Sequence, residues 1–395
     1  MSVRTVNFAS LSGKRVLLRV DLDLPVEQGV VPPGLVRFDS ALATIQQLQA
    51  AGARVIVMGH RGRPEGVDLE MSILPIAQAL MVKLPKESAR FVAMGDQKDL
   101  VAATQVMAKG DVLILENLRF HPGEQKNDPT FAKQLAALGD VYMDDAFGNC
   151  HRDHASMTGI TQFLESFAGP TIVRELEALE PVRSVKTHPY VAIVGGKKIA
   201  SKLHALTALL KEADVVFVGG SIATTFFVAQ GLNVGASLYV PEDVALAELL
   251  LQHTSLRLPV DVVVKKPDGT YAGILLEAIE PTDVIVDLGS ESVLRMRTEL
   301  EKAKMILWNG PVGIIEEPAS RVGSDAIAHL VAEFARGAVY GVVGGGNTVG
   351  LLEELRLTDF IDHVSTGGGA MLEYVGGQTL PALEVLKEET YVRQN

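Results

Sequence analysis

Two glycine-rich segments contain the residues best suited to chemistry. YGVVGGGNTVG at residues 340–350 and VSTGGGAMLE at residues 364–373 each place three glycines between an apolar, strand-like stretch and a helix-like stretch. A strand that turns tightly into a helix leaves free backbone N–H groups beside the positive end of the helix dipole, and glycine lets an anion approach them closely. A single triplet could be only a tight turn, but two in succession predict a ligand with more than one phosphate.

A second group of reactive side chains follows the apolar runs of the first half, which we predict to be strands at residues 14–20, 54–58, 112–115 and 141–143. Loops after parallel strands meet at one edge of a sheet, where open α/β sheets bind ligands. Arginine and histidine in these loops would form a pocket for a small polyanion. The side chains concerned are Arg37, at the start of a predicted helix over residues 37–51, and His60, Arg63, Arg119 and Arg152.

Three alternative chemistries have weaker support. His151 and His154 have an HxxH spacing that a metal could use, but a tight HxxH without support from cysteine and glutamate ligands at metal-site spacing is a weak signal. Gly344, Gly346 and Gly350 form a loose GxGxxxG, which could indicate a dehydrogenase, although it lies near the end of the chain. The GxxxxGK[ST] loop of P-loop kinases is absent. Phosphoryl transfer between a nucleotide and a small acid is therefore favoured over hydride transfer.

Composition restricts the class of protein. The 395 residues exceed one typical core, and 47% hydrophobic residues with few aromatics suit an α/β protein with buried parallel strands. The single cysteine, Cys150, rules out an internal disulfide and is typical of a reducing compartment. We found neither a signal-peptide core nor an apolar run of about 20 residues that could span a membrane. A net charge of −12 argues against nucleic-acid binding. We expect a cytoplasmic protein with two domains.

The second half repeats the strand and loop alternation with different loop chemistry. Strands are predicted at residues 190–194, 215–218, 260–264, 284–286 and 305–307, and their loops carry glycine, lysine and asparagine rather than arginine and histidine. A helical segment at residues 169–184, ended by Pro181, is the expected link between the two domains. Glycine loops suit nucleotide phosphates, so we expect one substrate per domain and the chemistry in the cleft between them.

The ordered motifs resemble the bacterial type of the phosphoglycerate kinase family over essentially the whole chain. They are RVDLDLP at 19–25, GHRGRP at 59–64, ENLRF at 116–120, DDAFG at 144–148 with HR at 151–152, VAIVGGKK at 191–198, GG at 219–220, ILWNGPVG at 306–313, VVGGGNT at 342–348 and VSTGGGA at 364–370. The resemblance implies two Rossmann-like domains with parallel sheets, joined by a hinge helix. It also implies reversible phosphoryl transfer between 1,3-bisphosphoglycerate and Mg-ADP, giving 3-phosphoglycerate and ATP.

The resemblance also implies domain bounds and general properties. Residues 1–170 would bind 3-phosphoglycerate, residues 171–185 would form the interdomain helix, and residues 186–377 would bind the nucleotide. The tail at 378–395 would pack back onto the first domain, which agrees with Leu383 and Leu386 at helical spacing after Leu380. The family is usually monomeric, acts on small molecules and uses Mg²⁺ with ATP or ADP.

The resemblance also implies a role for each residue of this chain that occupies a functional position in the family motifs. Asp21 and Asp23 would meet the hydroxyl and carboxylate region of the acid, and His60, Arg63, Arg119 and Arg152 would hold its phosphate and carboxylate. Arg37 would reach the transferring phosphoryl group from the acid side, and Lys198 with the N–H groups of Gly367, Gly368 and Gly369 would reach it from the nucleotide side. The remaining nucleotide residues would be Gly195, Gly196, Lys202, Gly219, Gly220, Asn309, Gly313, Glu316, Gly344, Gly345, Gly346, Asn347 and Thr348.

Three residues depart from the family pattern. Asn347 stands where the family has an aspartate that serves the magnesium site, and an amide oxygen lacks the negative charge that hard cations favour. Asp23 stands where asparagine is usual, and Lys197 replaces a small residue. A milder change is Asp144 in place of asparagine. Two alternatives to a working kinase follow from these departures: a non-catalytic paralogue that binds nucleotide or phosphoglycerate as a sensor or scaffold, and an enzyme for a different acyl phosphate.

Overall fold

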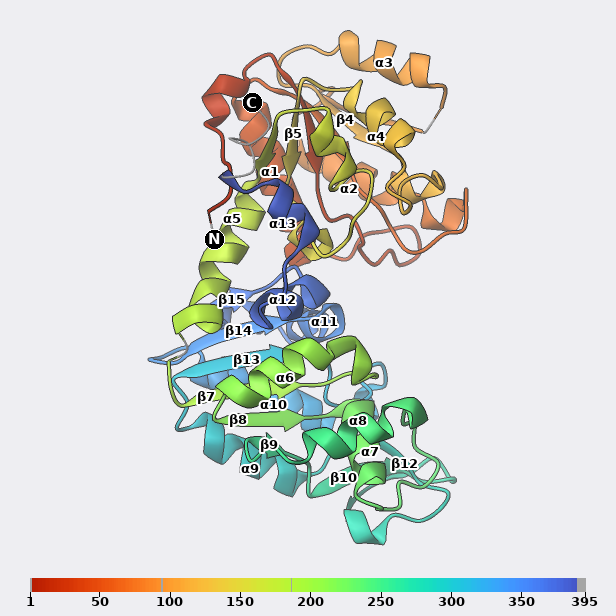
Figure 1. Cartoon of the computed structure of the whole chain (residues 1–395). Coiled ribbons are helices and arrows are strands. Elements are labelled where there is room, and N and C mark those ends of the chain that lie inside the picture. Colours follow the sequence, from red (N-terminus) through yellow and green to blue (C-terminus); the bar gives the residue numbers. More distant parts are fainter. Residues whose placement is uncertain (1, 94, 186, 389–395) are drawn as a thin grey trace. The chain divides into compact units, whose positions relative to one another are not determined.

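The computed structural model describes residues 2–93, 95–185 and 187–388. Within these residues the chain forms two compact units (Figure 1). The first contains residues up to Glu177 and those from Thr379 onward, and the second contains Ala178–Gln378. Residues 1 and 94 of the predicted first domain, residue 186 of the predicted nucleotide domain and residues 389–395 of the tail lie outside the described residues. None of the described helices has the length and apolar character needed to cross a membrane.

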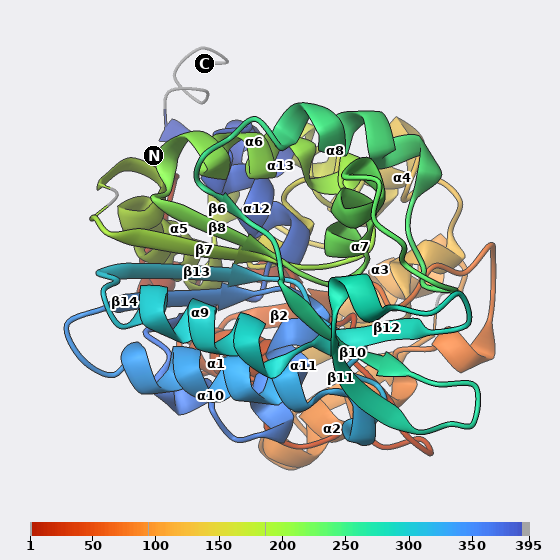
Figure 2. The same ribbon diagram turned by 90° about the horizontal axis from the view of Figure 1, so that it is seen from below.

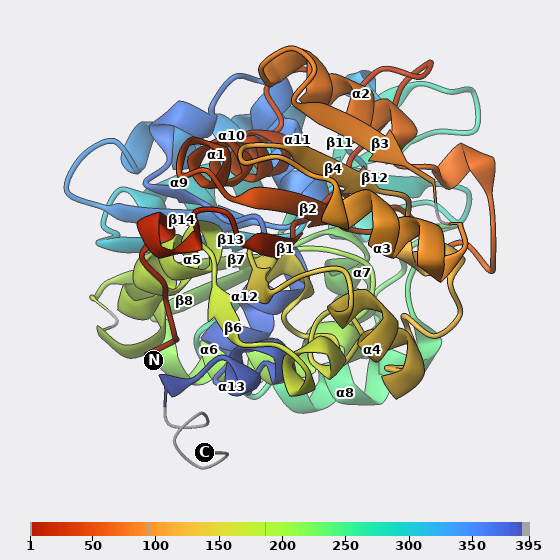
Figure 3. The same cartoon turned by 90° about the horizontal axis from the view of Figure 1, so that it is seen from above.

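The first unit is built on a six-stranded parallel sheet with the order β3-β4-β2-β1-β5-β6 (Figure 3). Its strands are β1 (Arg15–Arg19), β2 (Arg54–Met58), β3 (Ala89–Val92), β4 (Val112–Leu115), β5 (Val141–Asp144) and β6 (Ser166–Ala168). Its helices are α1 (Val36–Ala50), α2 (Leu74–Lys83), α3 (Gln97–Gln105), α4 (Pro129–Ala136), the start of α5 (Pro170–Glu180), and α13 (Pro381–Val385).

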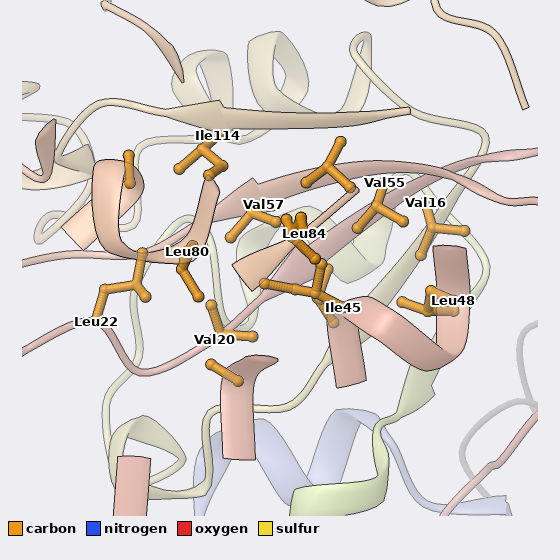
Figure 4. Close-up of a cluster of buried hydrophobic side chains, with 14 of the residues drawn as sticks. Val16, Val20, Leu22, Ile45, Leu48, Val55, Val57, Leu80, Leu84 and Ile114 are labelled. Carbon is orange, nitrogen blue, oxygen red and sulfur yellow. The ribbon is translucent and has the colours of Figure 1, made fainter. Parts of the chain in front are cut away.

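Both faces of this sheet are covered, which explains why its central strands are apolar without interruption. Val16 and Val57 point to the face packed by α1 and α2, where Ile45 and Leu80 lie among them (Figure 4). Leu17 and the strand residues whose side chains point the same way form a second apolar cluster with α3 and α4 on the other face of the sheet. Successive strand residues point to opposite faces, so each apolar run supplies both clusters.

The C-terminal segment packs within the first unit. The Arg4 N–H donates to the Leu386 carbonyl at 2.8 Å, and the Ala382 N–H donates to the Cys150 carbonyl at 3.1 Å. Leu383 and Leu386 are fully buried. The helical spacing noted in the sequence therefore forms the short helix α13 with a buried apolar face.

The second unit has a six-stranded parallel sheet with the order β15-β14-β13-β7-β8-β9. Its strands are β7 (Tyr190–Val194), β8 (Val215–Val218), β9 (Leu256–Arg257), β13 (Met305–Asn309), β14 (Tyr340–Gly344) and β15 (His363–Val364). Its helices are α6 (Leu203–Glu212), α7 (Gly220–Ala229), α8 (Val244–Leu250), α9 (Ser290–Leu300), α10 (Val322–Phe334), α11 (Gly346–Glu354) and α12 (Gly368–Val375). Helices α9 and α10 cover one face and α6 the other (Figure 2).

A separate antiparallel sheet, β11-β10-β12, departs from the expected parallel arrangement. It contains β10 (Asp261–Lys265), β11 (Tyr271–Leu275) and β12 (Val284–Leu288). The Lys266 N–H donates to the Thr270 carbonyl at 2.8 Å, which closes a tight turn between β10 and β11. A turn this short cannot carry a crossover, so the two strands must run antiparallel. The predicted class, α/β with two parallel sheets, is confirmed for both main sheets.

Helix α5 begins at Pro170 and ends at Glu180, directly before Pro181 as predicted. Pro181 has no N–H for the helical hydrogen bond, and a π-helical turn, Pro181–Val185, follows. The division between the two units falls between Glu177 and Ala178, inside α5.

Candidate functional site

In the first unit, the predicted arginines and histidine lie at the carboxyl edge of four adjacent strands. The order β4-β2-β1-β5 places the loops after these strands side by side. Asp21 follows β1, His60 follows β2, Arg119 lies just after β4 and Arg152 lies in the segment after β5. The sheet therefore brings together residues that are far apart in sequence, and we call Arg19, His60, Arg119 and Arg152 the basic cluster.

His60 lies at the centre of the basic cluster and is almost fully buried. Its Nδ1 lies 2.9 Å from Nη2 of Arg19, and its Nε2 lies 3.0 Å from Nη1 of Arg152. Burial, together with the charges of Arg19, Arg119 and Arg152, lowers the pKa of His60 well below its usual value. The imidazole is therefore neutral, and a neutral ring accepts only one hydrogen bond while a guanidinium only donates.

The surroundings of Arg19 decide which imidazole nitrogen accepts. Arg19 is fully buried, and its Nε donates to Ser156 Oγ at 3.1 Å. Ser156 Oγ donates in turn to Glu124 Oε1 at 2.6 Å, so a buried carboxylate fixes the position of the guanidinium. We therefore assign His60 Nδ1 as the acceptor from Arg19. Nε2 then carries the proton, and it faces Arg152 as a second donor.

Two donors that face each other need an anion between or beside them. Burial, followed by the charge of Arg152, lowers the pKa of Arg119 to about 10. Its Nη1 donates to the Gly62 carbonyl, and its Nε has no hydrogen-bond partner within the described residues. Burial also lowers the pKa of Arg152, against the opposing effect of Asp21. Positive charges held in this way, with N–H donors unused, are suited to a phosphate or carboxylate.

The acidic residues and the other two arginines border the basic cluster. Arg37 Nε lies 3.5 Å from Asp21 Oδ2, and Arg37 Nη1 donates to the Asp23 carbonyl at 3.4 Å. Asp23 Oδ1 accepts from the Gly62 N–H at 2.9 Å, and Asp23 Oδ2 lies 4.0 Å from His60 Nε2. Arg63 is exposed, and its charge lowers the pKa of Arg152. Asp21, Asp23 and Arg37 thus lie beside one another at the same edge of the sheet as the basic cluster.

His151 and His154 do not form a cation site. Burial and the charge of Arg152 lower the pKa of His151 to about 4. Burial and the charges of Arg119 and Arg152 lower the pKa of His154 to about 4. Among the described residues there is no cluster of three or more metal-binding side chains. Neighbouring guanidinium groups repel a cation, so their charge disfavours a metal ion at this segment.

The second unit contains two cavities at the carboxyl edge of its parallel sheet. An apolar cavity of about 430 Å³ is lined by Phe227, Leu238, Val286 and Val312, and also by Gly196, Gly220, Gly313, Glu316 and Asn347. A polar cavity of about 620 Å³ is lined by Lys202, Asn309, Gly345, Gly346, Asn347, Gly368, Gly369 and Glu373. Asn347 lines both.

The walls of these cavities depend on glycine. A Cβ on Gly195 would lie 2.0 Å from the Pro311 carbonyl oxygen, and one on Gly219 would lie 2.6 Å from Val312 Cβ. The two triplets also touch, because a Cβ on Gly368 would lie 2.8 Å from Gly345 Cα. Gly345 has φ +102°, which a residue with a side chain rarely adopts. These close contacts explain why glycine recurs at each strand end.

Both triplets end at the first turn of a helix. Gly345 is the N-cap of α11 and Gly367 is the N-cap of α12, so two helix N-termini border the polar cavity. Thr348 is fully buried near Gly345, and its Oγ1 has no hydrogen-bond partner in the described part of the chain. Backbone N–H groups and helix dipoles arranged in this way favour an anion.

Lys202 supplies a partly buried positive charge in the polar cavity. Its Nζ donates to the Gly195 carbonyl at 2.7 Å and to Asn309 Oδ1 at 2.8 Å. Burial lowers its pKa to about 8. Asn309 Nδ2 also donates to the Gly368 carbonyl at 3.0 Å, which connects Lys202 to the second triplet.

Six predicted residues on the nucleotide side lie outside the linings of both cavities: Gly195, Lys198, Gly219, Gly344, Thr348 and Gly367. Lys198 is exposed on the loop after β7 and lines neither cavity. The Gly367 N–H donates to Ser365 Oγ at 3.1 Å and is already used. Gly344 is buried at the end of β14, where a Cβ would lie 2.5 Å from Met371 Sδ. Its role in the structure is therefore close packing under the phosphate loop.

The residues at the first triplet do not fit a magnesium ion held by the protein. Mg²⁺ is usually bound through one or two carboxylates together with substrate phosphates. Asn347 offers only a neutral amide oxygen. The carboxylates in the cavity linings are Asp287, Glu316 and Glu373. Asp287 already accepts hydrogen bonds from Ser324 and Leu288, and burial raises the pKa of Glu373.

Sequence reasoning missed the support behind His60. Arg19, Ser156 and Glu124 fix the imidazole, but none of them was predicted to belong to the site. An arginine at the end of an otherwise apolar run was the one signal available, because a buried guanidinium needs several partners. Ser156 and Glu124 lie more than a hundred residues further along the chain than Arg19 and could not be identified from local pattern.

Comparison with known proteins places these features in one family. A family model described as phosphoglycerate kinase matches residues 6–378. The phosphoglycerate kinase of Thermosynechococcus vestitus is 43% identical over 98% of this chain and 99% of its own length, and that of Moorella thermoacetica is 39% identical over 98% and 100%.

Solved structures agree with the sequence relatives. The crystal structure of phosphoglycerate kinase from Pyrococcus horikoshii has a TM-score of 0.85 at 29% identity, covering 97% of this chain and 98% of that chain. The structure of phosphoglycerate kinase from Coxiella burnetii has a TM-score of 0.77 at 35% identity, covering 96% and 97%.

Proposed function

The chain belongs to the phosphoglycerate kinase family, and from that premise we propose how its residues carry out the reaction of the family. That reaction is reversible phosphoryl transfer between 1,3-bisphosphoglycerate and ADP, giving 3-phosphoglycerate and ATP, in glycolysis. The observation that most strongly supports the assignment of residues is the basic cluster, where a neutral His60 lies between two guanidinium groups.

We propose that the first unit is the phosphoglycerate-binding domain. Arg63, Arg119, Arg152 and the Nε2–H of His60 would bind the phosphate and carboxylate of the acid. Asp21 and Asp23 would accept from its hydroxyl group. Arg37, which lies beside both aspartates, would reach the acyl phosphate. Arg19 acts through His60 as a positioning residue, because it fixes the tautomer that donates.

The second unit would be the nucleotide-binding domain. The apolar cavity has the size and lining to take a purine base, with Glu316 at the ribose. Lys202, Asn309 and the N–H groups at Gly345 and Gly346 would bind the phosphates. Lys198 would reach the transferring group from its exposed position, together with the N–H groups of the second triplet at Gly368 and Gly369.

Phosphoryl transfer requires alignment and charge neutralisation rather than covalent chemistry by the protein. An acyl phosphate is already a good donor, so the arginines, lysines and backbone N–H groups suffice and no general base is needed. Water must be excluded while the group is transferred. We therefore propose that bending at the α5 segment accompanies catalysis.

The remaining properties are proposed on the same basis. Magnesium would enter coordinated by the phosphates of the nucleotide, since the chain contributes only the amide of Asn347 at the first triplet. When bound, the metal neutralises phosphate charge. We further propose that the protein acts as a cytoplasmic monomer on small-molecule substrates.

Isothermal titration calorimetry of two variants tests the assignment of one ligand to each unit. Arg119→Met should weaken 3-phosphoglycerate binding by about 10- to 100-fold, which corresponds to the loss of a charge-assisted hydrogen bond, and leave ADP binding unchanged. Lys202→Met should weaken ADP binding by a similar factor and leave 3-phosphoglycerate binding unchanged. Arg54→Met is the matched control, because Arg54 lies at the amino end of β2, away from the basic cluster. The assignment is wrong if Arg119→Met weakens ADP binding and spares the acid.

A further inference from the structure

Among the described residues that line the apolar cavity, Lys197 is the only lysine or arginine. Lys197 is exposed, and no other described residue forms a hydrogen bond or ion pair with its ammonium group. It lines the apolar cavity and not the polar one, so it lies beside the proposed base rather than beside the proposed phosphates. An ammonium group has three donors and no acceptor, so Lys197 can contact a base only by donating.

The start of helix α7 gives the wall of the apolar cavity a second positive feature. Gly220, Ser221 and Thr224 of this helix line the cavity, and the N-cap residue, Gly219, has no side chain that could accept from the first turn. The positive end of the helix dipole therefore lies in the cavity wall. Ser221 Oγ donates to the Leu238 carbonyl at 2.9 Å, and Thr224 Oγ1 donates to the Gly220 carbonyl at 3.4 Å. Together with Lys197, this wall favours an edge of the base that carries acceptors.

The carboxylates of the cavity lining offer little to an amino group on the base. Asp287 accepts from the Ser324 N–H at 2.8 Å, from Ser324 Oγ at 2.8 Å and from the Leu288 N–H at 2.9 Å. Glu316, the other carboxylate in the lining, is exposed and is assigned to the ribose. Both carboxylates are therefore engaged elsewhere, and an amino group that is buried without an acceptor weakens binding.

We propose that Lys197 contacts the base and makes the site prefer a 6-oxopurine, which is guanine or hypoxanthine, to adenine. The inference rests on the proposed nucleotide site and adds a specificity-determining residue to it. Guanine presents two acceptors, O6 and N7, on one edge, whereas adenine presents the acceptor N7 beside a donor amino group. Hypoxanthine has the same O6 and N7 as guanine. The ammonium group of Lys197 can donate to both acceptors of a 6-oxopurine, but it meets a second donor at the amino group of adenine.

The expected preference is moderate because Lys197 is exposed. A site that donates a hydrogen bond to one substrate binds the analogue that lacks the acceptor less tightly. Solvent and salt screen the charge of an exposed lysine, so the expected factor is about 3 to 10 rather than the larger factor of a buried contact. Adenine keeps N7 as an acceptor, so ADP still binds. The preference concerns the base alone and therefore applies to the magnesium complex of each nucleotide.

Calorimetric titration of the full chain with ADP and with inosine diphosphate (IDP), both in excess MgCl₂, tests the proposal. IDP differs from ADP only in the base, where an oxygen replaces the amino group and N1 gains a proton. The native chain should bind IDP about 3- to 10-fold more tightly than ADP. Lys197→Met keeps an apolar stem and removes the charge. It should weaken IDP binding by a similar factor and change ADP binding by less than about twofold, so that the preference disappears.

Lys304→Met provides the matched control. Lys304 is an exposed lysine that directly precedes β13, at the amino end of the strand whose carboxyl end carries Asn309. This variant removes the same charge from the same unit and should leave both affinities unchanged. Because Lys197 is exposed as well, thermal melting of Lys197→Met should match that of the native chain.

A native chain that binds ADP as tightly as IDP, or more tightly, overturns the proposal. A preference for IDP that survives in Lys197→Met overturns it too, and so does an equal weakening of both ligands, because the ammonium group would then act on the ribose or the phosphates. Each of these results leaves the proposed nucleotide site intact, since nucleotide binding is still measured. Absence of binding of both ligands would instead contradict the proposed function together with this inference.

Discussion

Replacing Asp144 by asparagine should stabilise the protein in a strongly pH-dependent way. Asp144 is fully buried at the end of β5, where burial is the main cause that raises the pKa of its carboxyl to about 7. Oδ1 accepts from the Ala146 N–H at 3.0 Å, a bond that an amide oxygen makes equally well. Asparagine keeps the shape and this hydrogen bond while removing the charge.

The size of the effect follows from the shift in pKa. The pKa of the Asp144 carboxyl rises from its ordinary value of 3.8 to about 7. Each pKa unit corresponds to about 1.36 kcal/mol, so burying the ionised form costs up to about 4 kcal/mol. Because the pKa of the folded state is raised, the folded state holds its proton more tightly. The stability contributed by Asp144 is therefore lost as the pH rises from about 4 to about 7.

Urea unfolding followed by circular dichroism between pH 4.5 and 8.5 measures this difference. At pH 8, Asp144→Asn should raise the free energy of unfolding by about 2 to 4 kcal/mol, and the gain should shrink toward zero as the pH approaches 4.

The neighbouring Asp145 is a matched control for which a much smaller gain is expected at pH 8. Asp145 is also buried, and burial raises its pKa to about 6. Its carboxylate accepts from the Thr171 N–H at 2.6 Å, from Thr171 Oγ1 at 2.9 Å and from Thr44 Oγ1 at 2.6 Å. An amide would lose the charge-assisted character of these three bonds, at a cost of about 1 to 3 kcal/mol that offsets most of the gain from removing the buried charge of Asp145. A gain for Asp144→Asn that is the same at pH 5 and pH 8, or a loss at pH 8, would refute the reasoning.

Three further predictions concern ligands. Asp23→Asn should tighten 3-phosphoglycerate binding by about 3- to 30-fold in calorimetry, because a carboxylate near His60 is removed from an anion site; unchanged affinity would contradict this. ADP binding should weaken by about tenfold from pH 7 to pH 9, because Lys202, with a pKa of about 8, must be protonated to bind phosphate; Lys202→Arg should lose this dependence. Gly195→Ala should abolish ADP binding in the same assay, because the added Cβ would lie 2.0 Å from Pro311 O, whereas Gly350→Ala, with open space around its Cβ, should not.

The sequence predicted the framework of the fold because buried parallel strands are continuous apolar runs. The strands at residues 54–58, 112–115, 190–194 and 215–218 have the predicted bounds. The edge strands β3, β6 and β9 were not predicted, since they are short or contain polar residues. Residues 260–264 were predicted as a strand, but the antiparallel partner β11 was not predicted, because β11 is only partly buried and has no clear apolar pattern.

The grouping of site residues could be predicted where those residues lie in the loops that follow parallel strands. Residues that follow parallel strands necessarily meet at one edge, so the grouping of His60, Arg119 and Arg152 followed from sequence. Contacts set by tertiary packing could not be read in this way. The bond from Arg19 to Ser156 and the seating of Lys202 against Asn309 depend on how segments far apart in the chain approach each other.

The most direct measurement of the central claim is turnover by the native chain with 3-phosphoglycerate and Mg-ATP in a coupled assay. We predict turnover of about 1 to 100 per second. Arg37→Met and Lys198→Met should each lower kcat by at least about 100-fold while calorimetric affinities for both ligands change by less than about threefold, because these residues act on the transferring group. A native chain that binds both ligands but shows no turnover would contradict the account and would indicate a non-catalytic binding protein.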